Sequence, residues 1–311
     1  MSITLDTSHK SISYAIGIDL GGTCIKSGIV DSKGKLVKEY KTDSYAHKSP
    51  KMVIAQIDKC ISELTKGFTK KLAGIGIGSP GVVHNGKVKY PPNFKKWGVV
   101  DLQKHFRSKY KMAVEVDNDA NCAGLAELKF GYGKKVKNFL FLTLGTGIGG
   151  AIFINGKMYK GEKNGAGEFG MATINFEGPD CLGGNQGAIE AYIGRNYFLE
   201  NEKGEVKKLR KNIDFDDITK FAAKGNKTAK SLFKKYGFYL GVALTNYFNL
   251  MDVRTCVLSG GISNGYKFFI SECNKTIKAR ALKTLRNECK VLKSNMNNNA
   301  GVLGAAALIL G

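Results

Sequence analysis

Residues 16–26, IGIDLGGTCIK, form the stretch from which the fold of this chain can be predicted. An apolar run at 15–20 ends in Gly21, Gly22 and Thr23, and a second apolar run at 25–30 follows at once. A turn at 31–34 precedes a third run at 36–40, so the pattern predicts three strands joined by tight turns. The glycines match neither a Walker loop nor a dinucleotide fingerprint. Their backbone N–H groups can hold phosphate oxygens, although a glycine hairpin is also an ordinary structural turn.

The chain repeats this pattern further on. Residues 138–157 read NFLFLTLGTGIGGAIFINGK, in which an apolar run at 139–144 leads into Gly145, Thr146 and Gly147. A second apolar run at 150–154 ends in an Asn-Gly turn. Two copies of one pattern are stronger evidence than a single motif, because two such accidents seldom occur in one chain. We predict that the two hairpins face each other as a phosphate clamp between two lobes.

The two motifs together, DxGGTxxK at residues 19–26 and LGTGxGG at 144–150, resemble the ROK family of sugar kinases and sugar-sensing repressors. This family lies within the actin/hexokinase-like superfamily, and the resemblance runs from about residue 14 to the C-terminus. It implies an α/β fold with two lobes of the actin/hexokinase-like (ribonuclease H-like) type, built from duplicated βββαβα lobes. We expect residues 1–117 and the C-terminal helix 298–311 to form one lobe, and residues 118–297 the other.

Several helices and strands can be placed by periodicity. Apolar spacing predicts an amphipathic helix at 51–65, and continuous helices are expected at 99–111, 186–200 and 227–251. Residues 1–13 are expected to be a short leader. This leaves no room for the DNA-binding domain that ROK repressors carry before the first hairpin, which favours the kinase branch.

The composition indicates a globular cytoplasmic protein. The chain has 311 residues, of which 43% are hydrophobic, and no stretch approaches the roughly 20 apolar residues of a membrane span. The N-terminus lacks the pattern of a secretory signal. The seven cysteines are scattered and odd in number, which is typical of free thiols in a reducing compartment.

The net charge of +22 raises the question of a nucleic-acid partner. The basic residues are mostly lysines spread along the chain, whereas base recognition favours arginine. We therefore expect a solvated basic surface and no specific nucleic-acid partner. The charge can still concentrate anionic substrates such as nucleotides.

Asp119 is the candidate catalytic residue. It lies in the sequence VDNDAN, where a short strand at 114–116 meets a helix expected at 120–129. Phosphoryl transfer to a sugar hydroxyl needs aligned phosphates, a metal ion and a carboxylate that accepts the proton. The alternative is an Asx run that caps the helix. The resemblance assigns Asn118 to sugar binding and Asp119 to the catalytic base.

Asp19 is the candidate metal-associated residue, because it ends the first strand beside the glycine turn. The resemblance implies that it positions Mg²⁺ through water, since Mg²⁺ keeps much of its hydration; the alternative is a turn-capping Asp. The expected ATP and phosphate contacts combine the two hairpins with a third glycine pair near the adenosine: Asp19, Gly21, Gly22, Thr23, Lys26, Gly145, Thr146, Gly147, Gly260 and Gly261. Lys26 is either a phosphate contact or a surface residue.

The remaining candidates are sugar contacts carried over from the family. They are carboxylates, amides and one glycine that would line the sugar pocket: Gly81, Asn93, Asn118, Asp119, Glu168 and Glu190. Glu168 lies in the glycine-rich sequence GAGEFG, where the backbone can approach a ligand closely.

The sequence departs from the family at its zinc motif. Most members carry GEIGH followed by CxCGxxGC, and the His and three Cys hold a structural zinc. The corresponding residues here are Met171, Cys181, Gly183 and Ala188. One thiolate cannot hold a tetrahedral zinc, so we expect no zinc. The missing His also leaves the identity of the sugar open.

These observations lead us to expect an ATP-dependent kinase that phosphorylates the 6-hydroxyl of a hexose, with glucose as the first choice. Mannose, fructose and N-acetylhexosamines remain open as substrates, and polyphosphate as a donor. The alternative is a non-catalytic sugar-sensing regulator of the same fold. Family members often dimerise, which leaves a homodimer open.

Overall fold

The computed structural model describes residues 12–92 and 94–311. Asn93 and most of the expected leader therefore lie outside the described residues. The chain divides into two compact units, one comprising Met1–Ala126 with Gly301–Gly311 and the other Glu127–Ala300. The first unit ends inside helix α3 (Asp119–Phe130), whose first residues belong to it. There, the Cys122 backbone contacts Gly304 of the C-terminal helix.

The first unit is built on a five-stranded sheet with the order β3-β2-β1-β4-β8. The first three strands pair antiparallel, and β4 and β8 continue the sheet in parallel with β1. Its elements are β1 (Tyr14–Leu20), β2 (Cys24–Asp31), β3 (Leu36–Asp43), α1 (Pro50–Thr65), β4 (Leu72–Ser79), α2 (Leu102–Tyr110), β8 (Ala113–Asn118) and α10 (Ala300–Leu310). A small second sheet contains β5 (Val82–His84), β6 (Lys87–Lys89) and β7 (Val99–Asp101).

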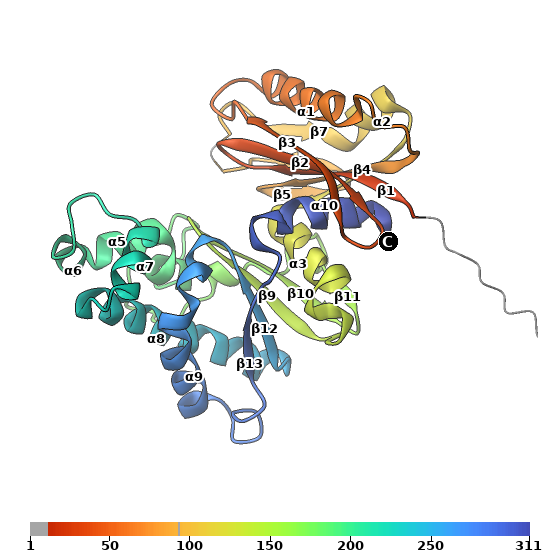
Figure 1. Ribbon diagram of the computed structural model, residues 1–311. Coiled ribbons are helices and arrows are strands. Elements are labelled where there is room, and N and C mark those ends of the chain that lie inside the picture. Colours follow the sequence, from red (N-terminus) through yellow and green to blue (C-terminus); the bar gives the residue numbers. More distant parts are fainter. Residues whose placement is uncertain (1–11, 93) are drawn as a thin grey trace, which may run out of the picture. The chain divides into compact units, whose positions relative to one another are not determined.

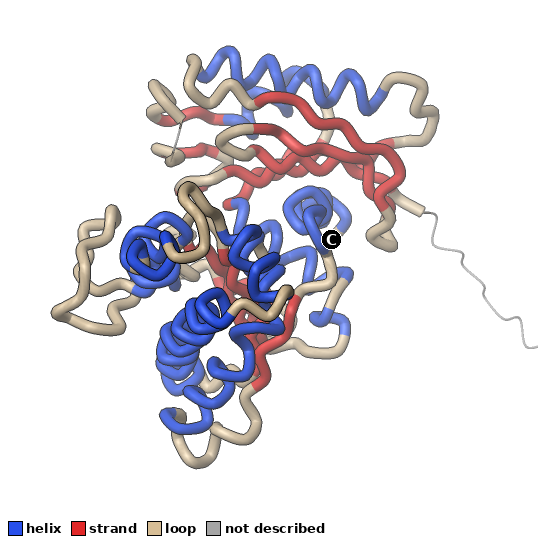
Figure 2. Tube along the Cα trace, turned by 60° about the vertical axis from the view of Figure 1, so that its left-hand side comes forward, coloured by secondary structure: helices blue, strands red, loops and turns tan. Residues whose placement is uncertain are grey.

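Alternation of isoleucine and glycine along β1 and β4 gives the sheet two different faces. The isoleucines at positions 16, 18, 75 and 77 are buried in one core with α1 and α2. On the opposite face, Gly17 and Gly76 leave room for the backbone of α10. Figures 1 and 2 show these helices on the two sides of the strands. The close approach of α10 therefore depends on residues that have no side chain.

The second unit repeats the strand order of the first. Its sheet has the order β11-β10-β9-β12-β13, with an antiparallel three-strand part followed by two parallel strands. The strands are β9 (Phe139–Leu144), β10 (Ile148–Ile154), β11 (Lys157–Tyr159), β12 (Thr255–Ser259) and β13 (Lys290–Lys293). This match confirms that the two hairpins in the sequence are copies of one structural unit.

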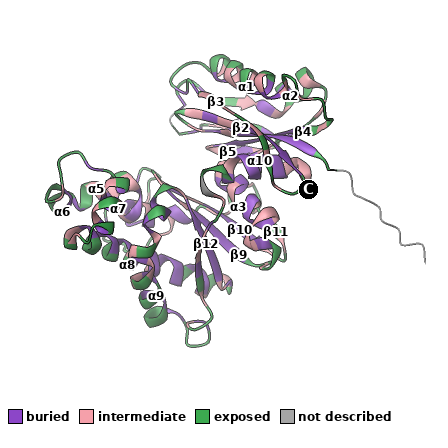
Figure 3. Cartoon of the chain, in the orientation of Figure 1, coloured by how far each residue is buried: buried purple, intermediate pink, exposed green. Residues whose placement is uncertain are grey.

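Helices of the second unit bury one face of its sheet. Leu140, Leu142 and Leu144 of β9 join residues of α8 and α9 in the largest core, and Figure 3 shows these strands as buried. The helices are α4 (Ile189–Ile193), α5 (Arg195–Asn201), α6 (Lys203–Lys207), α7 (Phe215–Ala223), α8 (Lys227–Met251) and α9 (Tyr266–Arg280). Short 3₁₀ turns are η1 (Tyr132–Lys134), η2 (Phe169–Met171), η3 (Gly261–Gly265) and η4 (Asn297–Asn299).

Two of the expected helices differ from the structure. The expected helix at 99–111 begins only at Leu102, because Val99 and Val100 form strand β7 and the Asp101 side chain caps the helix at Lys104 N. The expected helix at 186–200 is divided into α4 and α5 at Gly194, whose ψ of 138° is not helical. The helices expected at 51–65 and 227–251 are present.

Candidate functional site

Asp119 lies where strand β8 ends and helix α3 begins. Its Oδ1 accepts a hydrogen bond from Ala120 N at 2.8 Å. Asn118 Oδ1 accepts from the same N–H at 2.8 Å and from Asn121 N at 3.3 Å, so Asn118 supplies much of the helix cap. Asp119 Oδ2 has no hydrogen-bond partner among the described residues. The capping alternative thus applies chiefly to Asn118, and one oxygen of Asp119 remains available for a ligand.

Asn118 also holds the turn that contains Gly81. Its Nδ2 donates to Gly81 O at 3.1 Å, which brings two predicted sugar contacts together within the first unit. Gly81 has a φ of +85°, and an added Cβ would stand 2.7 Å from Pro91 Cα. A side-chain amide carries two N–H hydrogens, so one hydrogen of Asn118 is left for a second acceptor.

Asp19 and Asp119 form an acidic pair in the same unit. The pKa of Asp19 is raised from 3.8 to about 6, chiefly by burial and also by the charge of Asp119, while the charge of Lys26 acts to lower it. Lys26 pairs with Asp19 across the β1–β2 hairpin. The pKa of Asp119 is also raised, chiefly by burial, while backbone hydrogen bonds at Ala120 and at Asp119 itself lower it.

Gly301 borders this pair, although nothing in the sequence indicated a role for it. A Cβ added at Gly301 would stand 2.5 Å from Asp19 Cγ and Oδ2. Gly301 lies in the first turn of α10, so the glycine lets the Asp19 carboxylate lie against that helix. The small residues of the C-terminal helix were a possible signal, but from the sequence we assigned this helix only to the first lobe.

The acidic pair predicts how the stability of the metal-free protein depends on pH. An unfolded Asp has a pKa near 3.8 and folded Asp19 one of about 6, so between these values the folded chain binds more protons. Its free energy of unfolding should therefore fall as the pH rises from 4 to 6, and the loss should persist at higher pH. Asp19→Asn lacks this titration. Thermal unfolding in EDTA should show that the stability of Asp19→Asn relative to wild type increases as the pH rises from 4 to 6. A stability difference that stays constant over this range would contradict the prediction.

The first hairpin turn is open to solvent. Gly21 N donates to Cys24 O at 3.1 Å, and Thr23 O accepts from Ser44 N at 3.0 Å. Gly22 and Thr23 are exposed. These contacts shape a tight turn beside Asp19, as the sequence predicted, and leave its tip accessible to a ligand.

The glycine turns of the second unit lie side by side. Strands β9 and β12 are parallel neighbours with Ser259 opposite Thr143, so the residues that follow them meet at one edge of the sheet. Gly145 N donates to Gly147 O at 3.1 Å and closes the first turn. Gly260 has a φ of +85°, and an added Cβ would overlap the Leu144 backbone. The predicted phosphate residues of this unit are thus brought together, with Gly261 opening η3.

Glu190 connects the glycine turn to the loop that carries Glu168. Its Oε2 accepts from Ile148 N at 2.7 Å and lies 2.5 Å from a Cβ added at Gly147. The same oxygen is 3.1 Å from a Cβ added at Gly170. Glu168, which is exposed, lies two residues before Gly170. Since one carboxylate oxygen accepts a backbone hydrogen bond, Glu190 also holds the turn before Ile148. The family resemblance had implied only a sugar contact for this residue.

Tyr247 anchors this loop from helix α8. Its hydroxyl donates to Phe169 O at 2.6 Å, and the two rings have centroids 4.7 Å apart. Phe169 is the residue after Glu168. The sequence predicted α8 but not this contact, because a tyrosine on a buried helix face usually indicates packing alone.

The positions that correspond to the family's zinc ligands converge in the second unit. Cys181 and Ala188 belong to a small buried cluster, against which Met171 and Tyr197 pack. A Cβ added at Gly183 would overlap the Met171 sulfur. The Tyr197 hydroxyl accepts from Leu182 N at 2.9 Å. In the described part of the chain, no group of three or more His, Cys, Asp or Glu residues could hold a metal ion.

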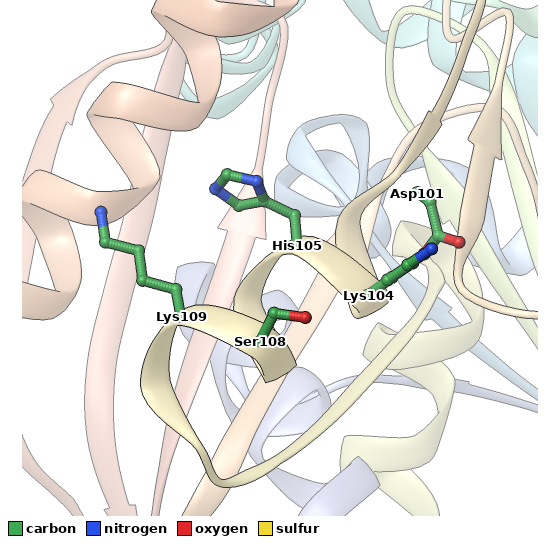
Figure 4. Close-up of a pocket in the computed structure, with 5 residues that line it drawn as sticks. All are labelled: Asp101, Lys104, His105, Ser108 and Lys109. Carbon is green, nitrogen blue, oxygen red and sulfur yellow. The ribbon is translucent and has the colours of Figure 1, made fainter.

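Figure 4 shows a pocket outside this arrangement. Its side chains extend from α2 and the residue before it in several directions: Asp101, Lys104, His105, Ser108 and Lys109. Lys109 pairs with Asp58 at 2.7 Å, and Asp101 caps the helix. None of the predicted site residues lines this pocket. Within residues 12–92 and 94–311, no helix is long and apolar enough to cross a membrane.

Comparison with known proteins places this geometry in a family. The xylose repressor of Bacillus subtilis is 29% identical over 310 residues, which cover 97% of this chain and 78% of the repressor. The glucokinase of Thermotoga maritima is 29% identical over 307 residues, which cover 94% and 96%. A solved ROK family glucokinase from Streptomyces griseus, in complex with glucose and AMPPNP, has a TM-score of 0.83 at 26% identity, covering 96% of this chain and 99% of that one.

The structural likeness confirms the expected α/β fold of the actin/hexokinase-like type. The model of the ROK family matches residues 15–311, nearly the full length of the sequence. The chain therefore belongs to the ROK family.

Proposed function

We propose that this protein is an ATP-dependent sugar kinase that phosphorylates the 6-hydroxyl of a hexose, with glucose as the first choice. The observation that carries the proposal is the position of Asp119, at the end of β8, with one carboxylate oxygen unengaged and its pKa raised. A carboxylate of raised pKa accepts a hydroxyl proton more readily, and a positioned base contributes about 10²–10⁴ to the rate. The glucose and AMPPNP bound to the Streptomyces griseus glucokinase support the choice of substrates.

The residues at Asp19 fit a magnesium ion. Burial and the charge of Asp119 both disfavour the ionised carboxylate of Asp19, and a hard divalent cation beside it would offset this effect. Asp19 would hold Mg²⁺ through water, and the ion would spread the charge of the phosphates. Asp119 would accept the proton of the sugar hydroxyl. The glycine turns would bind phosphate oxygens through backbone N–H groups.

The proposed sugar contacts are four polar side chains and one glycine. In the first unit, Asn118, with its remaining amide hydrogen, and Gly81 would contact the sugar. Asn93 stays a proposed contact outside the described residues. Glu168 and Glu190 would accept hydrogen bonds from sugar hydroxyls in the second unit. The Met171 side chain has no hydrogen-bond donor, whereas most family members have a His at this position. A hexose other than glucose, or an N-acetylhexosamine, is therefore the second choice of substrate.

A coupled assay of ADP release tests the proposal. Wild-type protein with Mg-ATP would be mixed with glucose, mannose, fructose and N-acetylhexosamines, and a sample without sugar would be the control. We expect sugar-dependent turnover, greatest with one hexose. Binding of sugar without any turnover would instead favour the second candidate, a sugar-sensing regulator. That candidate is supported by the xylose repressor among the relatives and by Met171.

We further propose that the loop at 171–188 is held without zinc. The Met171 sulfur packs against Gly183, and Asn185 Nδ2 donates to Met171 O at 2.6 Å. Metal analysis of the purified protein should find far less than one zinc per chain, because Cys181 is the only thiolate among the four positions. The combined variant Met171→His, Gly183→Cys and Ala188→Cys should bind about one zinc per chain, since these positions converge. Stoichiometric zinc in the wild-type protein would contradict the prediction.

A further inference from the structure

Arg195 lies beside the glycine turns of the second unit. It is the first residue of α5 and follows the break at Gly194. Its backbone N–H donates to Gly145 O at 3.0 Å, which fixes it against the turn between β9 and β10. A Cβ added at Gly194 would stand 2.7 Å from Glu190 O and 3.2 Å from Thr146 O, so the close approach requires a small residue there.

One guanidinium nitrogen of Arg195 lies near the turn at Gly260 and Gly261. Its Nη2 lies 3.8 Å from the position that a Cβ on Gly261 would occupy. Nε is buried and has no hydrogen-bond partner. No carboxylate among the described residues forms an ion pair with this side chain. By contrast, Arg254 pairs with Asp252 and Glu288, each at 3.0 Å.

The space next to this cation is open. A Cβ added at Gly145 would meet no atom within 4 Å, and one added at Gly261 would meet only Arg195. The two turns therefore present bare backbone, with an uncompensated positive charge between them. A planar guanidinium can donate two parallel hydrogen bonds to two oxygens of one phosphate group, and no ion pair within the described residues competes for this one.

We propose that Arg195 binds a phosphate group of the nucleotide that occupies the glycine turns. The proposal rests on the proposed function, in that this site holds ATP, and it adds a residue that neither hairpin motif contains. The bound anion would be the α- or β-phosphate, because Arg195 lies between the turn at Gly145 and the turn at Gly261. The Nη2 group, which lies beside Gly261, would donate to a phosphate oxygen.

Nucleotide affinity measured by calorimetry tests this assignment independently of turnover. Dissociation constants of ADP, Mg-ATP and adenosine would be determined for wild type, Arg195→Ala, Arg195→Lys and the control Arg254→Ala. A hydrogen bond between charged groups contributes enough for Arg195→Ala to weaken ADP and ATP binding about 10- to 100-fold. Adenosine binding should change less than about twofold because it carries no phosphate, and Arg195→Lys should fall between wild type and Arg195→Ala for ADP.

Each outcome decides between distinct conclusions. Unchanged ADP affinity in Arg195→Ala would overturn the assignment alone, provided that wild type binds ADP. An equal loss for ADP and adenosine would show that Arg195 only shapes the turn, which also overturns it. Arg195→Lys retains the side-chain length, so it tests the assignment even if Arg195→Ala fails to fold. A wild-type chain that binds no nucleotide would overturn the proposed function, and this assignment with it.

Discussion

Replacing Asp119 with asparagine should lower kcat by about 10³-fold, within the range expected for loss of a positioned general base. The amide oxygen can still accept the hydrogen bond from Ala120 N, so the start of α3 should be preserved. The amide cannot accept the proton of the sugar hydroxyl. Since the raised pKa of Asp119 reflects a carboxylate that burial destabilises, the variant should unfold at the same temperature as wild type or a higher one.

The experiment would compare Asp119→Asn with Glu115→Gln, a matched change on strand β8, which precedes Asp119. Glu115 is exposed and pairs with Arg107 at 3.3 Å, so its loss should leave turnover unchanged. Affinity for sugar and Mg-ATP should change little in Asp119→Asn, because the lost interaction belongs to the transition state. Turnover within threefold of wild type would show that Asp119 is not the base. A loss of sugar affinity as large as the loss of turnover would instead assign Asp119 to substrate binding.

The hairpins were predictable because their signals are local. Alternating apolar residues and glycine turns determine β1, β2, β9 and β10 without help from the rest of the chain. The duplication then implied a second sheet of the same order, which the structure contains. The helix at 227–251 was equally clear, since its apolar face repeats over many turns.

The site was less predictable because its contacts join distant parts of the chain. Gly301 meets Asp19 across more than 280 positions, and no spacing rule relates them. The division of the helix at Gly194 depends on contacts with Glu190 and Thr146, whereas the local sequence favours one continuous helix. The same division places Arg195 beside Gly145. The sequence analysis therefore missed the helix break at Gly194 and the position of Arg195 for the same reason.

In the motif around Asn118, the sequence did not show which residue caps the helix. Its sequence, VDNDAN, is compatible with a helix cap and with a catalytic carboxylate. Asn118 forms the cap, and its neighbour Asp119 is the proposed catalytic carboxylate. Residue types alone could not assign the two tasks. The hydrogen bonds of Asn118 to Ala120, Asn121 and Gly81 separate them.

Gly76→Ala should destabilise the protein by at least about 3 kcal/mol, the upper end of ordinary overpacking. The added Cβ would overlap the carbonyl oxygen of Ala305, which belongs to the backbone of α10 and cannot turn aside as a side chain can. The helix must move away from the sheet to relieve the overlap. For a chain of this size, the melting temperature should fall by roughly 5 °C, as measured by thermal unfolding.

Gly204→Ala is the matched control, because it makes the same chemical change where an added Cβ meets no atom within 4 Å. Gly204 lies in helix α6, so alanine should leave the melting temperature unchanged or raise it slightly. A change of less than about 2 °C in Gly76→Ala would show that α10 can shift at little cost. If α10 does move, Gly301 moves with it and the environment of Asp19 changes, so Mg-ATP affinity should fall even in the fraction that remains folded. The glycines of β1 and β4 thus link the stability of the first unit to its acidic pair.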